Sequence, residues 1–276
     1  MRGVGVIAVA LVLGTSALLL IAGAGGDRVS AADAPAADDK LKLGVVAIDA
    51  RIGDERVESS GTVVDPRAGL VVTSAHTVWG ATSLRLNTGL GILHGRVVAR
   101  APCADLAVIE IQPRLPGLVA PKPAGYTPQA TELLSAVGRR ADALLTIPIR
   151  AAGAANAAAV EPGMPKLDEA IRLDTAVVPE SSGGALVDGR GDVVGMTMAT
   201  TRGGALAVPW STIEARLREL RVDDRRIYVG WRSYYRCAPQ LHAYARREHA
   251  GYDPKDAVIN APVPATRLPG TEQLDR

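Results

Sequence analysis

Three residues of this chain, His76, Asp105 and Ser182, are of the types that together make a serine hydroxyl reactive. A serine attacks a carbonyl only when an imidazole within hydrogen-bond reach takes its proton and a carboxylate behind the ring fixes the tautomer. Taken singly, each residue is ordinary: Ser-Gly-Gly is a common turn, and a lone histidine or aspartate is usually structural. The chemistry therefore requires that the three side chains meet in space.

Each of the three candidates lies at the end of a predicted strand. Two valines lead into the turn that holds His76, Asp105 stands directly before an apolar run, and Ser182 precedes another. The strands concerned are 70–73, 106–111 and 185–187. Strand ends are where a β-rich scaffold presents side chains from separate parts of the chain, so this placement favours convergence.

Six short segments, in this order, resemble the trypsin-like (chymotrypsin-fold) serine peptidases, and within them the bacterial HtrA/Deg-type branch. The resemblance covers about residues 44–222 and includes no PDZ domain. The matching segments are Gly61-Thr62-Val63-Val64, the run from Leu70 to His76, Ala104 to Ile109, Asp174 followed by Ser182-Gly183-Gly184, Gly191 to Gly195, and Ala207-Val208-Pro209. The resemblance implies that His76 is the general base, Asp105 its orienting carboxylate and Ser182 the nucleophile.

The same resemblance implies an oxyanion hole formed by the backbone amides of Glu180 and Ser182. The family nearly always has glycine where this chain has Glu180, because the amide must turn toward the oxyanion in a conformation that a side chain disfavours. We therefore expect slow or substrate-induced activity. The alternative is an inactive homologue that serves as a binding or regulatory module. No cofactor and no metal is expected.

Specificity is predicted from the residue six before the nucleophile, which in this family lies at the base of the pocket for the side chain preceding the scissile bond. Here it is Ala176. A small apolar base offers no partner to lysine or arginine, so we expect cleavage of protein or peptide substrates after small or medium aliphatic residues. Asp174, two positions earlier, is interpreted as a loop acid bonded to backbone amides.

The strand pattern predicts an all-β fold with two antiparallel six-stranded barrels, at about 41–115 and 129–210, within a protease domain at 41–222. Residues 113–128 are Pro-rich and are predicted to connect the barrels. The predicted strands are 43–48, 61–64, 70–73, 83–86, 95–99 and 106–111 in the first barrel, and 133–137, 145–150, 170–173, 185–187, 193–198 and 205–208 in the second. A short helix capped by Ser211-Thr212 is predicted at 213–220.

The N-terminus has no charged residue between Arg2 and Asp27. This pattern predicts an export signal at 1–26, which is either cleaved or kept as a hydrophobic helix anchored in the membrane, since about 20 apolar residues suffice to span a bilayer. Residues 27–40 are expected to form a flexible linker. The protease domain is then extracytoplasmic, either secreted or held at the outer face of the cytoplasmic membrane.

Residues 223–276 form a C-terminal extension that is too short for a PDZ fold. Residues 234–248 are predicted to be helical and 260–269 extended, and the tyrosines of this segment suggest that it packs onto the body. The two cysteines, Cys103 and Cys237, are either bridged, as an oxidising compartment allows, or two buried thiols. A bridge would attach the extension beside Asp105.

Composition excludes several other classes of protein. The chain is 47% hydrophobic with a net charge of only +2, which gives no electrostatic footprint for nucleic acid. An α/β-hydrolase is disfavoured because Ser182 lacks the Gly-x-Ser-x-Gly elbow and the order of the three candidates differs. Phenylalanine is absent, so the cores must be built from valine, leucine, isoleucine and alanine. We therefore expect an exported serine endopeptidase that acts through an acyl-enzyme.

Overall fold

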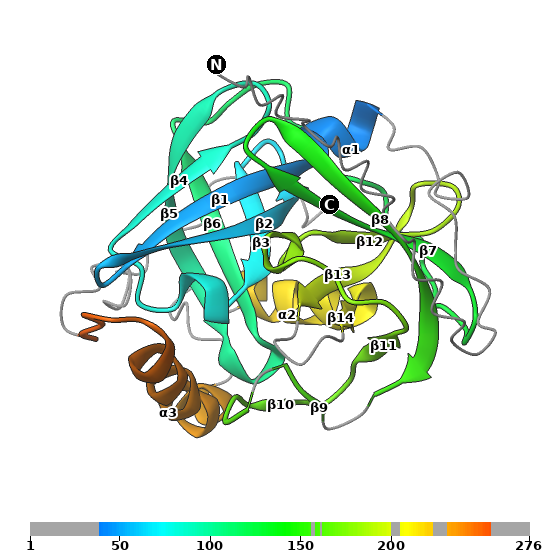
Figure 1. Cartoon of the computed structure of the whole chain (residues 1–276). Coiled ribbons are helices and arrows are strands. Elements are labelled where there is room, and N and C mark those ends of the chain that lie inside the picture. The colour runs from blue at the N-terminus through cyan, green and yellow to red at the C-terminus, as the bar shows by residue number, and fades with distance from the viewer. Residues whose placement is uncertain (1–38, 156–157, 161, 200–204, 223–230, 255–276) are drawn as a thin grey trace, which may run out of the picture.

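The computed structural model describes residues 39–155, 158–160, 162–199, 205–222 and 231–254. Within these ranges the chain forms two closed antiparallel β-barrels, which pack side by side, with helices at their edges (Figure 1). This confirms the predicted fold class. The predicted export segment at 1–26, most of the linker at 27–40 and the extended tail at 260–269 lie outside the described residues.

The first barrel has the strand order β1-β2-β3-β6-β5-β4. Its strands are β1 (Val45–Ile52), β2 (Glu55–Asp65), β3 (Leu70–Ser74), β4 (Ser83–Asn87), β5 (Ile92–Ala101) and β6 (Leu106–Gln112). Each corresponds to a predicted strand. The barrel closes tightly where glycine replaces a side chain: a Cβ on Gly61 or Gly95 would lie closer than 3.0 Å to aliphatic side chains of the interior.

The second barrel has the order β11-β14-β13-β12-β7-β8. Its strands are β7 (Leu133–Arg140), β8 (Ala143–Ala154), β11 (Ile171–Leu173), β12 (Ala185–Val187), β13 (Val193–Ala199) and β14 (Ala205–Pro209). A small hairpin, β9 (Ala158–Ala159) with β10 (Lys166–Leu167), was not predicted and lies between β8 and β11. Residues 113–132 connect the two barrels with no strand, close to the predicted connection.

In the part of the chain that the structure describes, three α-helices flank the barrels. They are α1 (Asp39–Gly44), α2 (Trp210–Val222) and α3 (Trp231–Glu248), and three short 3-10 helices are η2 (His76–Val78), η3 (Pro102–Ala104) and η4 (Pro179–Ser181). The predicted cap of α2 was wrong: the helix begins earlier, and the Thr212 hydroxyl donates to Glu169 instead (2.8 Å). Among the described residues, no helix combines the length and the apolar composition that crossing a membrane needs.

The two barrels meet along β2 and β7. β2 alternates between partly buried and exposed residues at its start and then becomes buried on both faces from Ser59 to Val63, because the second barrel covers its outer face. Ser60 is the centre of this contact: its Oγ donates to the Glu180 carbonyl (2.6 Å) and accepts the N–H of Arg139 (2.9 Å). A polar seam therefore joins the barrels directly at the loop that carries Ser182.

Arg139 links the barrels a second time. Its guanidinium is buried, with 3% of the residue exposed, and donates to the carbonyls of Val45 (2.7 Å), Asp142 (3.0 Å) and Lys42. The contact ties the end of β7 to α1 and the start of β1. Because none of the three acceptors is a carboxylate, burial lowers the pKa of the guanidinium below its usual value.

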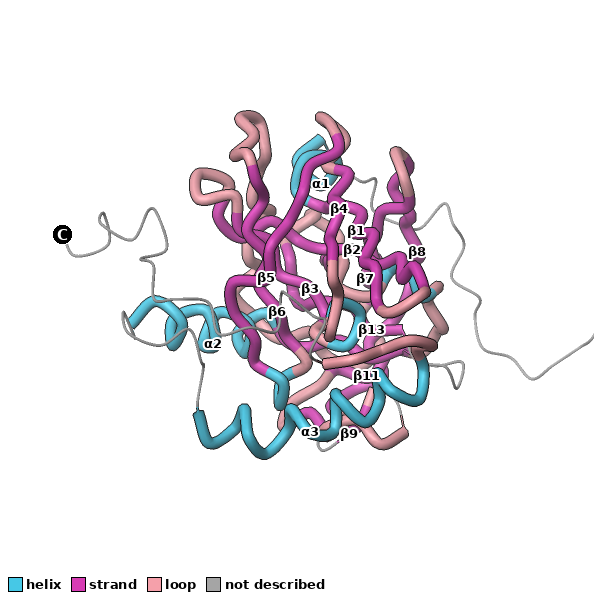
Figure 2. The backbone as a smooth tube through the Cα atoms, turned by 90° about the vertical axis from the view of Figure 1, so that its left-hand side faces the viewer, coloured by secondary structure: helices cyan, strands magenta, loops and turns pink. Residues whose placement is uncertain are grey.

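The helix α3 lies across one end of the molecule, next to the first barrel, in both views of the fold (Figures 1 and 2). Its buried face presents Cys237, Ala238, Leu241 and Ala245 to the barrel. After the helix, the N–H of Asp54 donates to the Ala250 carbonyl (3.0 Å), which fixes the chain against the β1–β2 turn. The prediction that the C-terminal extension packs onto the body is confirmed for these residues.

Candidate active site

His76 and Asp105 form a buried pair at one end of the first barrel. β3 ends at Ser74 and passes into η2, which begins with His76, while η3 ends immediately before Asp105. The ring Nδ1 of His76 and Oδ2 of Asp105 are 2.6 Å apart, and Oδ1 accepts the backbone N–H of His76 (2.8 Å). With 1% of Asp105 exposed, both carboxylate oxygens are committed to His76 and hold its ring in one orientation.

Asp105 reaches this position through a left-handed backbone conformation, with φ of 50°, at the end of η3. Aspartate is one of the few non-glycine residues that adopt this region readily. Its carbonyl also accepts the N–H of Ala75 (2.8 Å), the residue before His76. Backbone and side chain of Asp105 therefore both fix the His76 turn.

Ser182 lies in a tight loop of the second barrel, with 2% of the residue exposed. Its carbonyl accepts the N–H of Ser60 (2.8 Å), which places the loop on β2. A Cβ on the next residue, Gly183, would lie closer than 3.0 Å to the Ser60 carbonyl and to the Thr73 hydroxyl, and Gly183 has φ of 85°. The glycine after Ser182 is thus required by the close approach of the loop to β2 and β3, the strand that leads to His76.

The predicted oxyanion-hole residues lie in the 3-10 turn η4. The N–H of Ser182 donates to the carbonyl of Pro179 (3.0 Å), so in this conformation that amide is already bonded. Glu180 does not have a positive φ here, and its carboxylate Oε1 is 3.7 Å from Nε of Arg140. The carboxylate therefore faces a cation, and the turn has to open before the Ser182 amide can bind a substrate oxygen.

Residues near the predicted specificity pocket are largely exposed. Ala176 is exposed, in the loop that follows β11. Asp174 accepts the backbone N–H of Arg150 (2.8 Å) and the hydroxyl of Thr175 (2.9 Å) through one carboxylate oxygen. Asp174 is accordingly a loop acid bonded to a backbone amide, as the sequence indicates.

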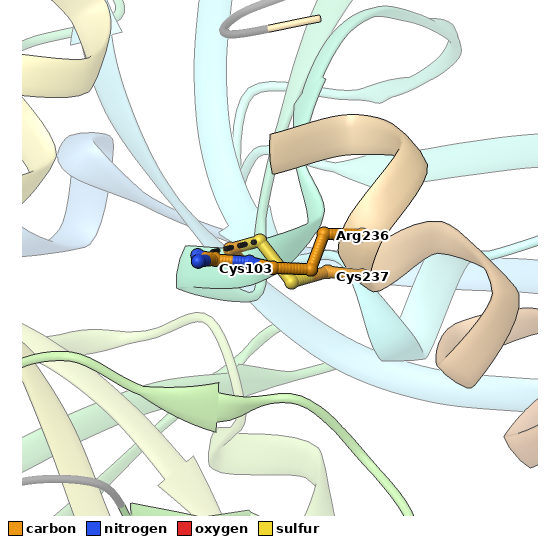
Figure 3. Close-up of a disulfide and its surroundings, with 3 residues drawn as sticks. All are labelled: Cys103, Arg236 and Cys237. Carbon is orange, nitrogen blue, oxygen red and sulfur yellow. Dashed lines mark hydrogen bonds between the residues drawn. A yellow bond between two sulfur atoms is a disulfide. The ribbon is translucent and has the colours of Figure 1, made fainter. Parts of the chain in front are cut away.

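The helix α3 contacts η2 and η3; a bridge to the Asp105 loop was one of the two predicted alternatives, whereas the contact with the His76 loop was not predicted. A disulfide joins Cys103 in η3 to Cys237 in α3, with Cα atoms 5.2 Å apart. Figure 3 shows this bridge with Arg236, whose Nη2 donates to the sulfur of Cys103 (3.5 Å). One turn beyond Leu241, the ring of Tyr244 meets the His76 ring edge to face, with centroids 6.0 Å apart. The extension therefore supports the loops of both His76 and Asp105.

A second aromatic contact fixes the far side of η2. The indole N–H of Trp79 donates to Nδ1 of His242 (3.2 Å), and the hydroxyl of Tyr252 lies 2.6 Å from the same nitrogen. Burial, together with the positive charges of Arg246 and Arg100, lowers the pKa of His242 below its usual value. His242 is therefore a neutral acceptor.

Sequence comparison identifies the family of this chain. The domain described as "Trypsin-like peptidase domain" matches residues 59–196, which is half of the chain. This chain belongs to the trypsin-like peptidase family, and its relatives place it with the HtrA-type members.

Among these relatives, the Synechocystis protein HhoA is 32% identical over 145 residues, covering 51% of this chain and 36% of HhoA. "Serine protease HTRA2, mitochondrial" of Bos taurus is 32% identical over 154 residues, covering 55% of this chain and 33% of that protein. The present chain thus matches about a third of the length of these relatives.

Solved structures agree on the fold. The active form of the Rv3671c protease from M. tuberculosis superimposes with a TM-score of 0.57 at 20% identity, covering 64% of this chain and 81% of that one. The MamO protease domain from Magnetospirillum magneticum gives a TM-score of 0.55 at 25% identity, covering 64% and 97%.

Proposed function

We propose that this chain is a serine endopeptidase in which Ser182 is the nucleophile, His76 the general base and Asp105 the residue that orients the base. The buried bond of 2.6 Å between His76 Nδ1 and Asp105 Oδ2 is the observation that carries the proposal. With Nδ1 donating to the carboxylate, Nε2 is the ring nitrogen that would take the Ser182 proton. Ser182 then adds to the scissile carbonyl, the protonated ring donates to the leaving amine, and water releases the acyl-enzyme.

The state of the oxyanion turn supports slow or substrate-induced turnover. Stabilising the tetrahedral intermediate requires the amides of Glu180 and Ser182, and the latter is bonded to the Pro179 carbonyl. Rotation of the Pro179–Glu180 peptide would release the Ser182 N–H and direct the Glu180 N–H toward the same point. Loss of one such donor costs about a hundredfold to a thousandfold in turnover, so the population of the open turn sets the rate.

Ala176 is proposed to limit the side chain before the scissile bond to small or medium aliphatic residues of protein or peptide substrates. The exported location stays a prediction from residues 1–26.

A catalytically inactive binding module is the second candidate. The hydrogen bond from the Ser182 amide to Pro179 favours it, because this bond blocks the oxyanion hole for as long as it persists.

Labelling with a fluorophosphonate probe separates the two candidates. An endopeptidase is expected to form a covalent adduct that is lost in Ser182→Ala, whereas Ser181→Ala, which changes the neighbouring hydroxyl, should still be labelled. Absence of Ser182-dependent labelling across pH and added peptides would reject the first candidate in favour of the second.

A further inference from the structure

A pocket of about 190 Å³ lies on the surface where the two barrels meet. The first barrel contributes residues of β1, β2, β4 and β5, and the second contributes the turn between β7 and β8. Four arginines and two acids line it: Arg56, Arg85, Arg139, Arg140, Asp49 and Glu58. Neither His76, Asp105 nor Ala176 is part of its lining.

The pocket is directly next to the Ser182 loop. Glu58 and Ser59, which line it, immediately precede Ser60, whose N–H donates to the Ser182 carbonyl (2.8 Å). Arg140 lines it from β7 and lies 3.7 Å from Glu180, two residues before Ser182. The pocket therefore borders the loop that carries Ser182, although Ser182 itself is not part of the lining.

The charges in the pocket do not cancel. Arg56 is bonded to Asp49. Arg140 is shared between Glu58 and Glu180, each at 3.7 Å and so beyond a direct hydrogen bond, and 63% of its side chain is exposed. Its donors thus remain available to an incoming acceptor.

Two further arginines add positive charge, and neither is hydrogen-bonded to a carboxylate, although the charge of the nearby Asp142 carboxylate partly offsets that of Arg139. The side chain of Arg85 is exposed and makes no hydrogen bond or ion pair with any residue that the structure describes. Arg139 lies buried in the pocket wall and is bonded only to main-chain carbonyls, as described above. Nearby anions are therefore favoured here, because they would offset a buried cation.

We propose that this pocket binds an acidic side chain of the substrate on the leaving-group side of the scissile bond, with Arg85 and Arg140 as the residues that contact it. The inference rests on the proposed endopeptidase function. Ala176, which would receive the side chain before the scissile bond, is not part of the pocket. We therefore assign the pocket to a residue that follows the bond, and the mirror set of peptides described below tests this assignment.

The chemistry of the pocket favours one carboxylate over a larger anion. Asp49 and Glu58 stand in the same wall and would repel a polyphosphate or nucleic acid. Ile92, 58% exposed at the rim, offers apolar surface to the methylene groups of a glutamate.

The test is a panel of internally quenched peptides with small aliphatic residues before the bond. Glutamate or glutamine is placed at each of the four positions after the bond and, as a mirror set, at the four before it. We expect kcat/KM to favour glutamate over glutamine by about three- to tenfold at one position after the bond. This factor lies between the effects of exposed and of buried charged pairs. Arg85→Gln and Arg140→Gln, singly and together, should bring this ratio toward one.

Arg216→Gln is the matched control, because it removes an arginine paired with a glutamate on α2, outside the pocket. It should keep the full preference for glutamate. Equal cleavage of the glutamate and glutamine peptides by the native protein, or a preference that survives in the Arg85 and Arg140 double variant, would overturn the inference. A preference confined to positions before the bond would overturn the leaving-group assignment.

Binding measurements separate this inference from the proposed function. If no peptide is hydrolysed, the endopeptidase proposal fails, and fluorescence anisotropy of the same peptides with the full chain carrying Ser182→Ala still tests the pocket. Tighter binding of the glutamate peptides that is lost in Arg85→Gln would support it, and equal dissociation constants would reject it.

Discussion

At the scale of single residues, the site combines a well-formed acid and base pair with an oxyanion turn that is closed. His76 and Asp105 are bonded through both carboxylate oxygens, whereas the amide of Ser182 is satisfied by Pro179. Glu180 adapts to the closed turn without a positive φ, and its carboxylate is near Arg140. In the proposed mechanism, proton transfer and stabilisation of the oxyanion would therefore be controlled by different residues.

Replacing Glu180 by glycine should speed acylation. Glycine lowers the cost of turning the Pro179–Glu180 peptide, which is on the order of 1 to 3 kcal/mol for an unfavourable conformation. We expect the second-order rate constant for fluorophosphonate labelling to rise by about tenfold. Glu180→Ala removes the carboxylate but keeps a Cβ, so an equal gain in the alanine variant would assign the effect to charge. A glycine variant no faster than the native protein would contradict the backbone explanation.

The candidate residues of the site could be proposed from sequence because each lies in a short local pattern. His76 follows a valine-rich strand, and Ser182 precedes two glycines that its loop requires for packing on β2. The roles of Ser60, Arg140 and Tyr244 were missed for the opposite reason. Each acts through a partner far away in sequence, and no local pattern marks such a partner.

At the scale of elements, α3 is a support for the two short helices of the site. The sequence predicted this helix from residue 234 and suggested that its segment packs on the body, but helical periodicity does not identify the surface that receives the buried face. The structure joins it to η3 through Cys237 and to η2 through Tyr244 and His242. Because of these contacts, α3 is an integral part of the fold.

Docking of α3 should weaken in acid because of His242. Its pKa is lowered in the folded protein, since it is desolvated, lies near Arg246 and Arg100, and accepts the Trp79 N–H on Nδ1. The unfolded chain therefore takes up a proton that the folded chain resists. The contribution of His242 to stability is fully present above its unfolded pKa of about 6.5 and is lost as the pH falls from there toward its pKa in the folded protein.

His242→Gln offers the matched comparison, because its amide oxygen accepts the same N–H without titrating. The thermal unfolding midpoint of the native protein should fall more between about pH 7.5 and 5.5 than that of the variant. Parallel pH profiles for the two proteins would show that His242 carries none of the acid sensitivity.

At the scale of the whole molecule, two barrels are held in one arrangement by a polar seam and a buried arginine. Strand alternation predicted both barrels, and the cores consist mostly of the expected valine, leucine, isoleucine and alanine, with methionines, Trp79 and Trp210 in addition. The position of one barrel on the other could not be predicted from the sequence. It depends on Ser60 and Arg139, two polar residues whose local sequence does not mark them as contacts between the barrels.

Removing the buried arginine should destabilise the molecule. Arg139→Met keeps the length of the side chain but leaves the carbonyls of Val45 and Asp142 without their donors, at a cost of about 2 to 3 kcal/mol. Urea unfolding should show a lower midpoint, while Arg172→Met, on an exposed position of β11, should change stability by no more than about 0.5 kcal/mol. A midpoint that is unchanged or higher in Arg139→Met would refute the role given to this residue.

The link between Cys103 and Cys237 spans 134 positions of the chain. Because synthesis runs from the N-terminus to the C-terminus, every strand of both barrels is made before Cys237. The disulfide, and with it the support of α3 for the His76 loop, can therefore form only after all the strands of both barrels have been synthesised. During synthesis, the strands of both barrels are consequently complete before α3 is present to support the candidate site.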